Sequence, residues 1–161
     1  MALVIEPAKV PTHEEELFAP SEQRILSSSR DGTLRVWRAL TRKEILTLVG
    51  HFNGVTFCAW SPDSQQVVSG SFDITLKIWD TKAGTDVQTL SGHNGTITCC
   101  SWSPDGQRII SGCWEDKTVK IWKMKAGQAF LTFVGTQTLS LFVLGHQMDN
   151  TFCQLPMTAH L

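Results

Sequence analysis

The sequence carries little charge of either sign, and this absence excludes several classes of protein. Charged residues make up 18% of the 161-residue chain, and the formal net charge is -1. A chain this close to neutral has no long-range field to attract nucleic acid or an anionic membrane surface, so neither is an expected partner. Hydrophobic residues make up 42% of the chain. Because disorder requires low hydrophobicity together with high net charge, this composition indicates a folded chain.

Paired cysteine motifs are also absent. The cysteines are odd in number and contain no C-x-x-C pair: Cys58, Cys99, Cys100, Cys113 and Cys153. This pattern favours neither a disulfide framework nor a zinc site, and it fits a reduced setting inside the cell, in the cytoplasm or the nucleus. Cys58 and Cys100 lie 42 residues apart. We expect both to be small buried hydrophobic side chains.

Long apolar runs are missing as well. The N-terminal residues MALVIEPAK contain too short an apolar run for a secretory signal. The best candidate for a membrane helix, residues 129–144, is interrupted by glycine, threonine, glutamine and serine. A membrane-spanning helix needs about 18 or more consecutive apolar residues, so no span and no membrane partner is expected.

The sequence does contain a repeat with a period of 42 or 43 residues. The stretch SGSFDITLKIWD at 69–80 resembles SSSRDGTLRVWR upstream and SGCWEDKTVKIWK downstream. Tryptophans, aspartates, prolines and Gly-His pairs recur at this period: Trp37, Trp79 and Trp122; Asp31, Asp73 and Asp116; Pro20, Pro62 and Pro104; Gly50-His51 and Gly92-His93. Several kinds of landmark that share one period indicate a chain built from repeated structural units.

Each repeat predicts four short β-strands joined by tight turns. In the second repeat, residues 55–60, 66–71, 74–79 and 87–90 are short runs rich in β-forming residues. The segments between them, Ser61-Pro62-Asp63-Ser64 among them, have compositions typical of turns. No helical period of comparable length competes with this pattern, so the predicted fold class is all-β.

This order of landmarks resembles the WD40 repeat. A Gly-His pair, then roughly thirty residues, then a Trp-Asp pair characterise that family. The similarity covers about residues 19–135, although only Trp79-Asp80 is a literal Trp-Asp pair. The resemblance implies WD40-type β-propeller blades, each a four-stranded antiparallel sheet. About three such blades are expected, which make an incomplete ring.

The repeats divide the chain into segments. We expect an atypical N-terminal segment at 1–16, a partial repeat at 17–50, complete repeats at 51–92 and 93–135, and a divergent C-terminal tail at 136–161. Where the first repeat should begin with an apolar strand, the sequence reads HEEELF, so we expect its blade to lack a convincing first strand.

Three blades are too few for a closed ring, because propellers typically have four to eight. Two apolar flanks are therefore expected to be open, since neighbouring repeats supply one another's core. The chain is interpreted as a fragment, a truncated isoform of a larger propeller protein, or a chain that borrows blades from elsewhere. Self-association through open blade edges is one way to cover the flanks.

The repeated polar residues have two interpretations. His51, Ser69 and Asp73 are the ingredients of a catalytic triad, but the set recurs in the next repeat, whereas a nucleophile is needed once. In the WD40 family these positions and the tryptophan form a hydrogen-bonded chain inside a blade. The resemblance therefore implies a structural network, with no catalytic or metal-binding role and no cofactor, at His51, Ser69, Asp73, Trp79, His93, Ser111, Asp116, Trp122, Asp31 and Trp37.

Function is expected at positions that differ between the repeats. Partners of WD40 proteins often dock on the face that carries the turn after the second strand and the loop after Gly-His. This implies a partner-binding rim at Arg30, Phe52, Phe72 and Trp114, and such residue types are common interface hot spots. The leading hypothesis is a non-catalytic scaffold that mediates protein–protein interaction with protein partners that the sequence does not name.

Three alternatives stay open. One is an enzyme, for instance a hydrolase among the serine, histidine and aspartate residues; the unrepeated histidines His13, His146 and His160 have no matched nucleophile neighbours, and activity lost on changing one of them would support this alternative. A second is a substrate-receptor adaptor of a cullin-type ubiquitin ligase, because the segment 79–82, WDTK, resembles the Trp-Asp-x-Arg/Lys ending found in such receptors. The third is a truncated product with no independent function.

Overall fold

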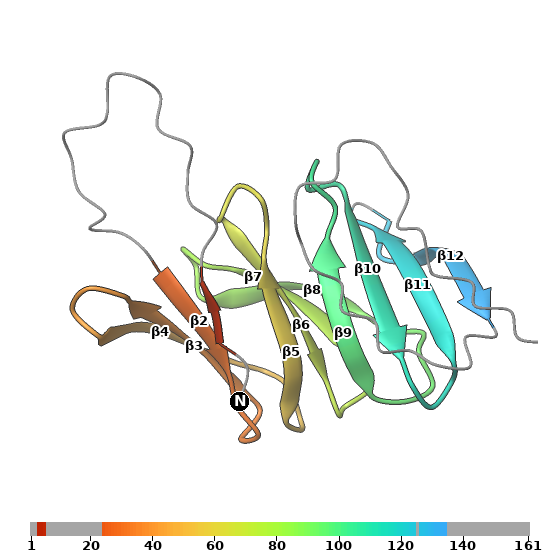
Figure 1. Cartoon of the computed structure of the whole chain (residues 1–161), viewed down its shortest axis with the longest axis horizontal. Coiled ribbons are helices and arrows are strands. Elements are labelled where there is room, and N and C mark those ends of the chain that lie inside the picture. The colour runs from red at the N-terminus through yellow and green to blue at the C-terminus, as the bar shows by residue number, and fades with distance from the viewer. Residues whose placement is uncertain (1–2, 6–23, 125, 135–161) are drawn as a thin grey trace, which may run out of the picture.

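A computed structural model describes residues 3–5, 24–124 and 126–134, and its regular elements are β-strands (Figure 1). In this described part of the chain, twelve strands form three four-stranded antiparallel sheets, which we call blades 1, 2 and 3. Blade 1 contains β1 (Leu3–Ile5), β2 (Arg24–Ser28), β3 (Thr33–Arg38) and β4 (Lys43–Val49). Blade 2 contains β5 (Val55–Trp60), β6 (Gln66–Ser71), β7 (Leu76–Asp80) and β8 (Thr85–Leu90). Blade 3 contains β9 (Ile97–Trp102), β10 (Arg108–Cys113), β11 (Thr118–Lys123) and β12 (Ala129–Val134).

The strands of each blade are hydrogen-bonded in chain order, as consecutive hairpins require. The blades stand side by side in an arc, with β5 of blade 2 between blade 1 and β9 of blade 3 (Figure 1). The predicted all-β class and WD40-type blades are therefore confirmed. Among the described residues, none belongs to a helix long and apolar enough to cross a membrane.

Blade 1 has a first strand, which corrects the expectation from the sequence. β1 pairs antiparallel with β2, with Val4 opposite Leu26. The 42-residue offset pointed instead to residues 13–18, which lie outside the described part of the chain. Strand pairing requires backbone groups that reach the edge of β2, and it does not require a fixed spacing along the sequence. The periodic pattern could therefore not locate this strand.

An aspartate fixes the turn between the second and third strands of each blade. Asp73 Oδ1 accepts hydrogen bonds from the N–H and the Oγ1 of Thr75, at 3.0 Å and 2.7 Å. Asp31 and Asp116 bind the equivalent threonines in the same way. The residue after each aspartate has a positive φ: Gly32 (86°), Ile74 (66°) and Lys117 (54°). This conformation is strained for a β-branched residue, so the aspartate holds Ile74 in an unfavourable backbone region.

The core lies between the blades. One buried cluster joins blades 1 and 2, and a second joins blades 2 and 3. Blade 2 contributes neighbouring residues to opposite clusters: Val67 and Trp79 pack toward blade 1, whereas Val68 and Ile78 pack toward blade 3. All four are 0% exposed. Because both faces of blade 2 are covered, its central strands are apolar on both sides.

Glycine allows blades 2 and 3 to approach closely. A Cβ atom on Gly70 of β6 would lie 2.4 Å from Cγ2 of Ile97 in β9, a distance that no real contact reaches. Thr56 Oγ1 is within hydrogen-bond reach of the carbonyl oxygens of both Gly70 and Ile97. The two blades are thus joined by close packing and by a hydrogen bond across the junction.

The end faces of the arc are less buried than the faces between blades. The residues that match the fully buried core positions of blade 2 are only half-buried: Ile25 and Trp37 on blade 1, Ile110 and Ile121 on blade 3. Side chains of this kind are ordinarily covered by a neighbouring blade in repeat proteins.

Candidate functional site

Four side chains of blade 2 form one hydrogen-bonded chain. The indole Nε1–H of Trp79 in β7 donates to Oγ of Ser69 in β6 at 2.8 Å. Ser69 Oγ lies 2.7 Å from Nε2 of His51, which precedes β5. His51 Nδ1 lies 2.7 Å from Oδ2 of Asp73, in the turn after β6. The network therefore ties two strands and two loops of one blade together.

The donors and acceptors of this chain fix its direction. An indole N–H can only donate, so Ser69 accepts from Trp79; an ionised Asp73 can only accept, so Nε2 of a neutral His51 accepts from the Ser69 hydroxyl. The imidazole proton is then on Nδ1, where it is donated to Asp73. Burial lowers the pKa of His51 and outweighs the opposing effect of Asp73, so the ring is neutral near pH 7. Burial acts to raise the pKa of Asp73, but hydrogen bonds from Thr75 and His51 outweigh it and the net pKa is lowered.

Blade 3 repeats this network. Trp122 Nε1 donates to Ser111 Oγ at 2.8 Å, Ser111 Oγ lies 2.8 Å from His93 Nε2, and His93 Nδ1 lies 2.9 Å from Asp116 Oδ2. Thr118 adds a contact of 3.1 Å between its Oγ1 and His93 Nδ1. Two copies with the same geometry indicate a structural unit that satisfies buried polar groups in blades 2 and 3.

Blade 1 contains only part of the network. Trp37 Nε1 donates to Ser27 Oγ at 2.9 Å. Asp31 accepts hydrogen bonds from Thr33 and lies 3.6 Å from the Arg35 guanidinium, so it is separate from the tryptophan. The structure thus joins eight of the ten predicted network residues in two complete chains, and it leaves Asp31 and Trp37 in separate interactions.

The His51–Ser69–Asp73 arrangement has the connectivity of a catalytic triad, but its serine is inaccessible to solvent. Ser69 is 0% exposed, and its hydroxyl already contacts both an imidazole and an indole. A nucleophile must reach the substrate carbonyl, and this one faces the interior of the blade. The arrangement stabilises the fold without access for a substrate.

Three residues of types that commonly ligate metals lie close together in blade 3. One ligand atom each from His93, Cys113 and Asp116 lies within 4.8 Å of the others. Both ring nitrogens of His93 are engaged by Ser111 and Asp116. Burial raises the pKa of the Cys113 thiol to about 11, so the thiol is neutral near pH 7. Metal binding here would break the network that holds the blade.

The cysteines predicted to act as hydrophobic residues are in the core. Cys58 and Cys100 are each 0% exposed, and each belongs to a different inter-blade cluster. Burial raises the pKa of Cys58 to about 12. Neither thiol has the exposed, thiolate-stabilising surroundings of a reactive cysteine.

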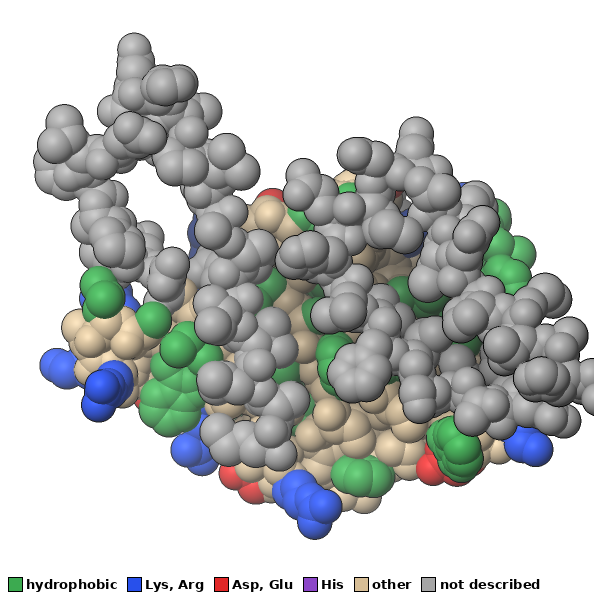
Figure 2. Space-filling view, in the orientation of Figure 1, with side chains coloured by type: hydrophobic (Ala, Val, Ile, Leu, Met, Phe, Trp, Pro, Cys, Tyr) green, Lys and Arg blue, Asp and Glu red, His purple; other side chains and the backbone are tan. Residues whose placement is uncertain are grey.

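Two of the predicted partner-binding residues meet at one end of the blades. Arg30 and Phe72 line a shallow hollow of about 350 Å³ together with Asn53 and Gly54. The Phe72 N–H donates to the Gly54 carbonyl oxygen at 3.0 Å, and this bond holds the two loops together. At this lower edge of the molecule, apolar side chains alternate with basic and acidic ones (Figure 2).

The other two predicted residues are exposed nearby on the same set of loops. Phe52 is 96% exposed, although its backbone N–H is fixed by a 3.0 Å hydrogen bond to Asp73 Oδ2. Trp114 is 58% exposed in the equivalent turn of blade 3, and it does not line the hollow. We call Arg30, Phe52, Phe72 and Trp114 the rim patch.

Comparison with protein-family models identifies the repeat. Residues 16–38, 42–80 and 84–123 each match the family described as WD domain, G-beta repeat, and together these segments span more than half of the chain. The chain belongs to the WD40 family. No curated protein matches it.

Two of the three matched WD40 repeats straddle two blades. The matched segment 42–80 contains β4 of blade 1 and then β5, β6 and β7 of blade 2. The segment 84–123 likewise contains β8 of blade 2 and three strands of blade 3. One repeat thus completes the preceding blade and begins the next, which couples the folding of neighbouring blades.

Two side-chain interactions in this chain were not predicted from the sequence. Asn53 stabilises the loop after Gly-His, because its Oδ1 accepts from the Gly54 N–H at 2.7 Å and its carbonyl accepts from Ser71 Oγ at 3.1 Å. Arg24 lies over the Trp60 ring, with 4.7 Å between Cζ and the ring centroid. Sequence periodicity gives no sign of this contact, since the two residues belong to different blades.

Proposed function

We propose that this WD40 chain is a non-catalytic scaffold that binds protein partners through the rim patch. The supporting observation is that three aromatic side chains are exposed on one set of loops whose backbone is fixed by the buried networks. Phe52, Phe72 and Trp114 are 96%, 46% and 58% exposed. Large exposed aromatic groups gain most when a partner removes them from water.

The networks prepare the rim patch for binding. Asp73 accepts a hydrogen bond from the Phe52 N–H and directly follows Phe72 in the chain. In blade 3 the Lys117 N–H donates to the Trp114 carbonyl at 3.3 Å, which closes the turn. A fixed backbone lowers the conformational entropy that is lost on binding, so the exposed rings need little ordering.

The test compares the partners of two triple variants. The first, Phe52→Ser/Phe72→Ser/Trp114→Ser, removes the aromatic side chains of the rim patch. The second, Phe130→Ser/Leu131→Ser/Phe133→Ser, removes side chains of β12 that are 52%, 43% and 46% exposed, and it serves as the matched control. Quantitative affinity purification should recover the same partners with the wild type and the control, and lose them with the rim variant. Partners that bind equally well to the rim variant would contradict the proposal.

The end faces of the arc support a second part of the proposal, that further blades cover them. Ile25 and Trp37 at one end, and Ile110 and Ile121 at the other, are only half-buried. A longer WD40 chain, of which this would be a fragment or truncated isoform, or a second copy would supply the missing contacts. Size-exclusion chromatography with light scattering tests this point. A stable monomer without aggregation would contradict it.

A ubiquitin-ligase adaptor is a more specific version of the scaffold. In the Trp-Asp-x-Lys ending Trp79 is buried, whereas Asp80 Oδ1 accepts the backbone N–H of Lys82 at 2.7 Å and Lys82 is exposed. The wild type should capture a cullin-4 ligase, and Lys82→Glu should abolish this capture. Unchanged capture by the variant, or no capture by the wild type, would remove this option.

A further inference from the structure

An arginine fills the junction between blades 1 and 2 at the end opposite the rim patch. The guanidinium of Arg24, at the start of β2, stacks on Trp60 at the end of β5 with 4.7 Å from Cζ to the ring centroid. Its NH2 group donates to the Ser64 carbonyl at 2.7 Å, and its NH1 group donates to Thr81 Oγ1 at 3.3 Å. One cation of blade 1 thus contacts a ring and two oxygen acceptors of blade 2.

The junction between blades 2 and 3 has an equivalent tryptophan and an equivalent turn, but no arginine. Trp102 matches Trp60 in register, since each is the last residue of its strand and pairs with the second residue of the next strand. The following turns also match: the Ser64 N–H donates to the Ser61 carbonyl at 2.9 Å, and the Gly106 N–H donates to the Ser103 carbonyl at 2.9 Å. At the position of Arg24 this junction has a shorter, neutral side chain, that of Gln66.

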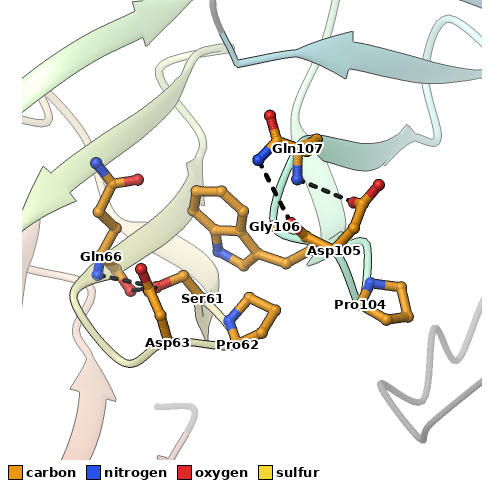
Figure 3. Close-up of a pocket in the computed structure, with 9 residues that line it drawn as sticks. Ser61, Pro62, Asp63, Gln66, Pro104, Asp105, Gly106 and Gln107 are labelled. Carbon is orange, nitrogen blue, oxygen red and sulfur yellow. Dashed lines mark hydrogen bonds between the residues drawn. The ribbon is translucent and has the colours of Figure 1, made fainter.

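A hollow takes the place of the missing guanidinium. It has a volume of about 370 Å³ and its lining includes Gln66, Trp102 and Gly106 (Figure 3). The two turns face each other across it, and a Cβ atom on Gly106 would lie 3.8 Å from Pro62 Cδ. The Gly106 carbonyl corresponds to the Ser64 carbonyl that accepts from Arg24. A water molecule occupies roughly 30 Å³, so the hollow has room for the end of a long side chain.

The lining of the hollow favours a cation. Trp102 is 9% exposed, and its indole N–H, like that of Trp60, has no hydrogen-bond partner among the described residues, so the attraction for a cation comes from the ring face and not from this N–H. Asp63 and Asp105 also line the hollow. Hydrogen bonds from the Ser61 and Ser103 hydroxyls lower the pKa values of these carboxyl groups, so both are charged near pH 7. An aromatic ring and two carboxylates in the lining of one hollow attract positive charge.

We propose that this hollow binds an arginine side chain presented by a partner protein, with its guanidinium stacked on Trp102 as that of Arg24 stacks on Trp60. A planar guanidinium can stack and donate hydrogen bonds at the same time, which a lysine ammonium cannot do. The site is independent of the rim patch, because it lies at the other end of the strands. The outcome of the test for arginine binding therefore leaves the proposal for the rim patch unaffected.

The test follows the tryptophan indole N–H signals of the full chain by two-dimensional NMR. The probe is N-acetyl-arginine amide, and the control is N-acetyl-citrulline amide, which has nearly the same shape without the charge. The Trp102 signal, identified with Trp102→Phe, should shift with half-saturation on the order of 1–10 mM arginine derivative. It should not move with citrulline. No shift of this signal, or equal shifts with both probes, would overturn the proposal.

A variant that fills the site gives the second measurement. Gln66→Arg should recreate the Arg24 arrangement, weaken binding of the arginine probe at least about tenfold, and leave the chain as thermally stable as the wild type or more so. Ser91→Arg adds the same charge on an exposed loop at the rim-patch end and should bind the probe like the wild type. Asp105→Asn, which keeps an acceptor for the turn, should weaken binding roughly threefold. Unchanged binding to Gln66→Arg would show that the probe binds elsewhere and would refute the site.

Discussion

The network predicts that Ser69→Ala is among the most damaging small changes in the chain. Its hydroxyl contacts Trp79 Nε1 at 2.8 Å and His51 Nε2 at 2.7 Å, and these residues are 0% and 8% exposed. Without the hydroxyl, both nitrogens are buried with no partner. Each such group costs about 1–3 kcal/mol, so the free energy of unfolding should fall by about 3 kcal/mol. The missing oxygen leaves too small a cavity to add much to this cost.

Blade 1 provides the matched control for this prediction. Ser27 has the same position, but among the described residues its hydroxyl binds only Trp37 Nε1, at 2.9 Å, and Trp37 is half-buried. Ser27→Ala should therefore cost only about 1 kcal/mol. Urea unfolding followed by tryptophan fluorescence measures both values. Equal losses for the two variants, or a loss below about 1 kcal/mol for Ser69→Ala, would refute the view that the network stabilises each blade by satisfying buried groups.

Three further predictions concern stability. Gly70→Ala would place a Cβ 2.4 Å from Ile97 Cγ2, so we expect a loss of about 2–3 kcal/mol in urea unfolding, and a neutral effect would contradict the close approach of blades 2 and 3. Ile74→Gly relieves a φ of 66° and should raise stability by about 0.5–1 kcal/mol, whereas any loss would argue against strain there. The pKa values of His51 and His93 are lowered below 6.5 by burial, so their contribution is complete above about pH 6.5 and is lost as the pH falls toward the folded-state values. Unfolding measured between about pH 7.5 and 5 should show this decline, and a flat profile would show that the two rings are not held neutral.

Much of the fold could be predicted because the repeat fixes strand register. In blade 2 the first two expected strands, 55–60 and 66–71, coincide with β5 and β6, and the turn aspartates bind the backbone as their position suggested. The limits of the prediction lie where neighbours in space are distant in sequence. β1 pairs with β2 from outside the period, and the Arg24–Trp60 contact crosses from one blade to the next. The hollow beside Trp102 likewise depends on which residue the preceding blade presents, so no single repeat could reveal it.

The central claim is that the rim patch binds a protein partner, and calorimetry with one purified partner tests it most directly. A partner recovered with the wild-type chain would be titrated into the wild type, into Phe52→Ser/Phe72→Ser/Trp114→Ser, and into the β12 triple variant. We expect the rim variant to bind at least about tenfold more weakly, because at least one exposed aromatic anchor contributes more than about 1.4 kcal/mol. The β12 variant should bind like the wild type. Equal affinity for the wild type and the rim variant would contradict the account.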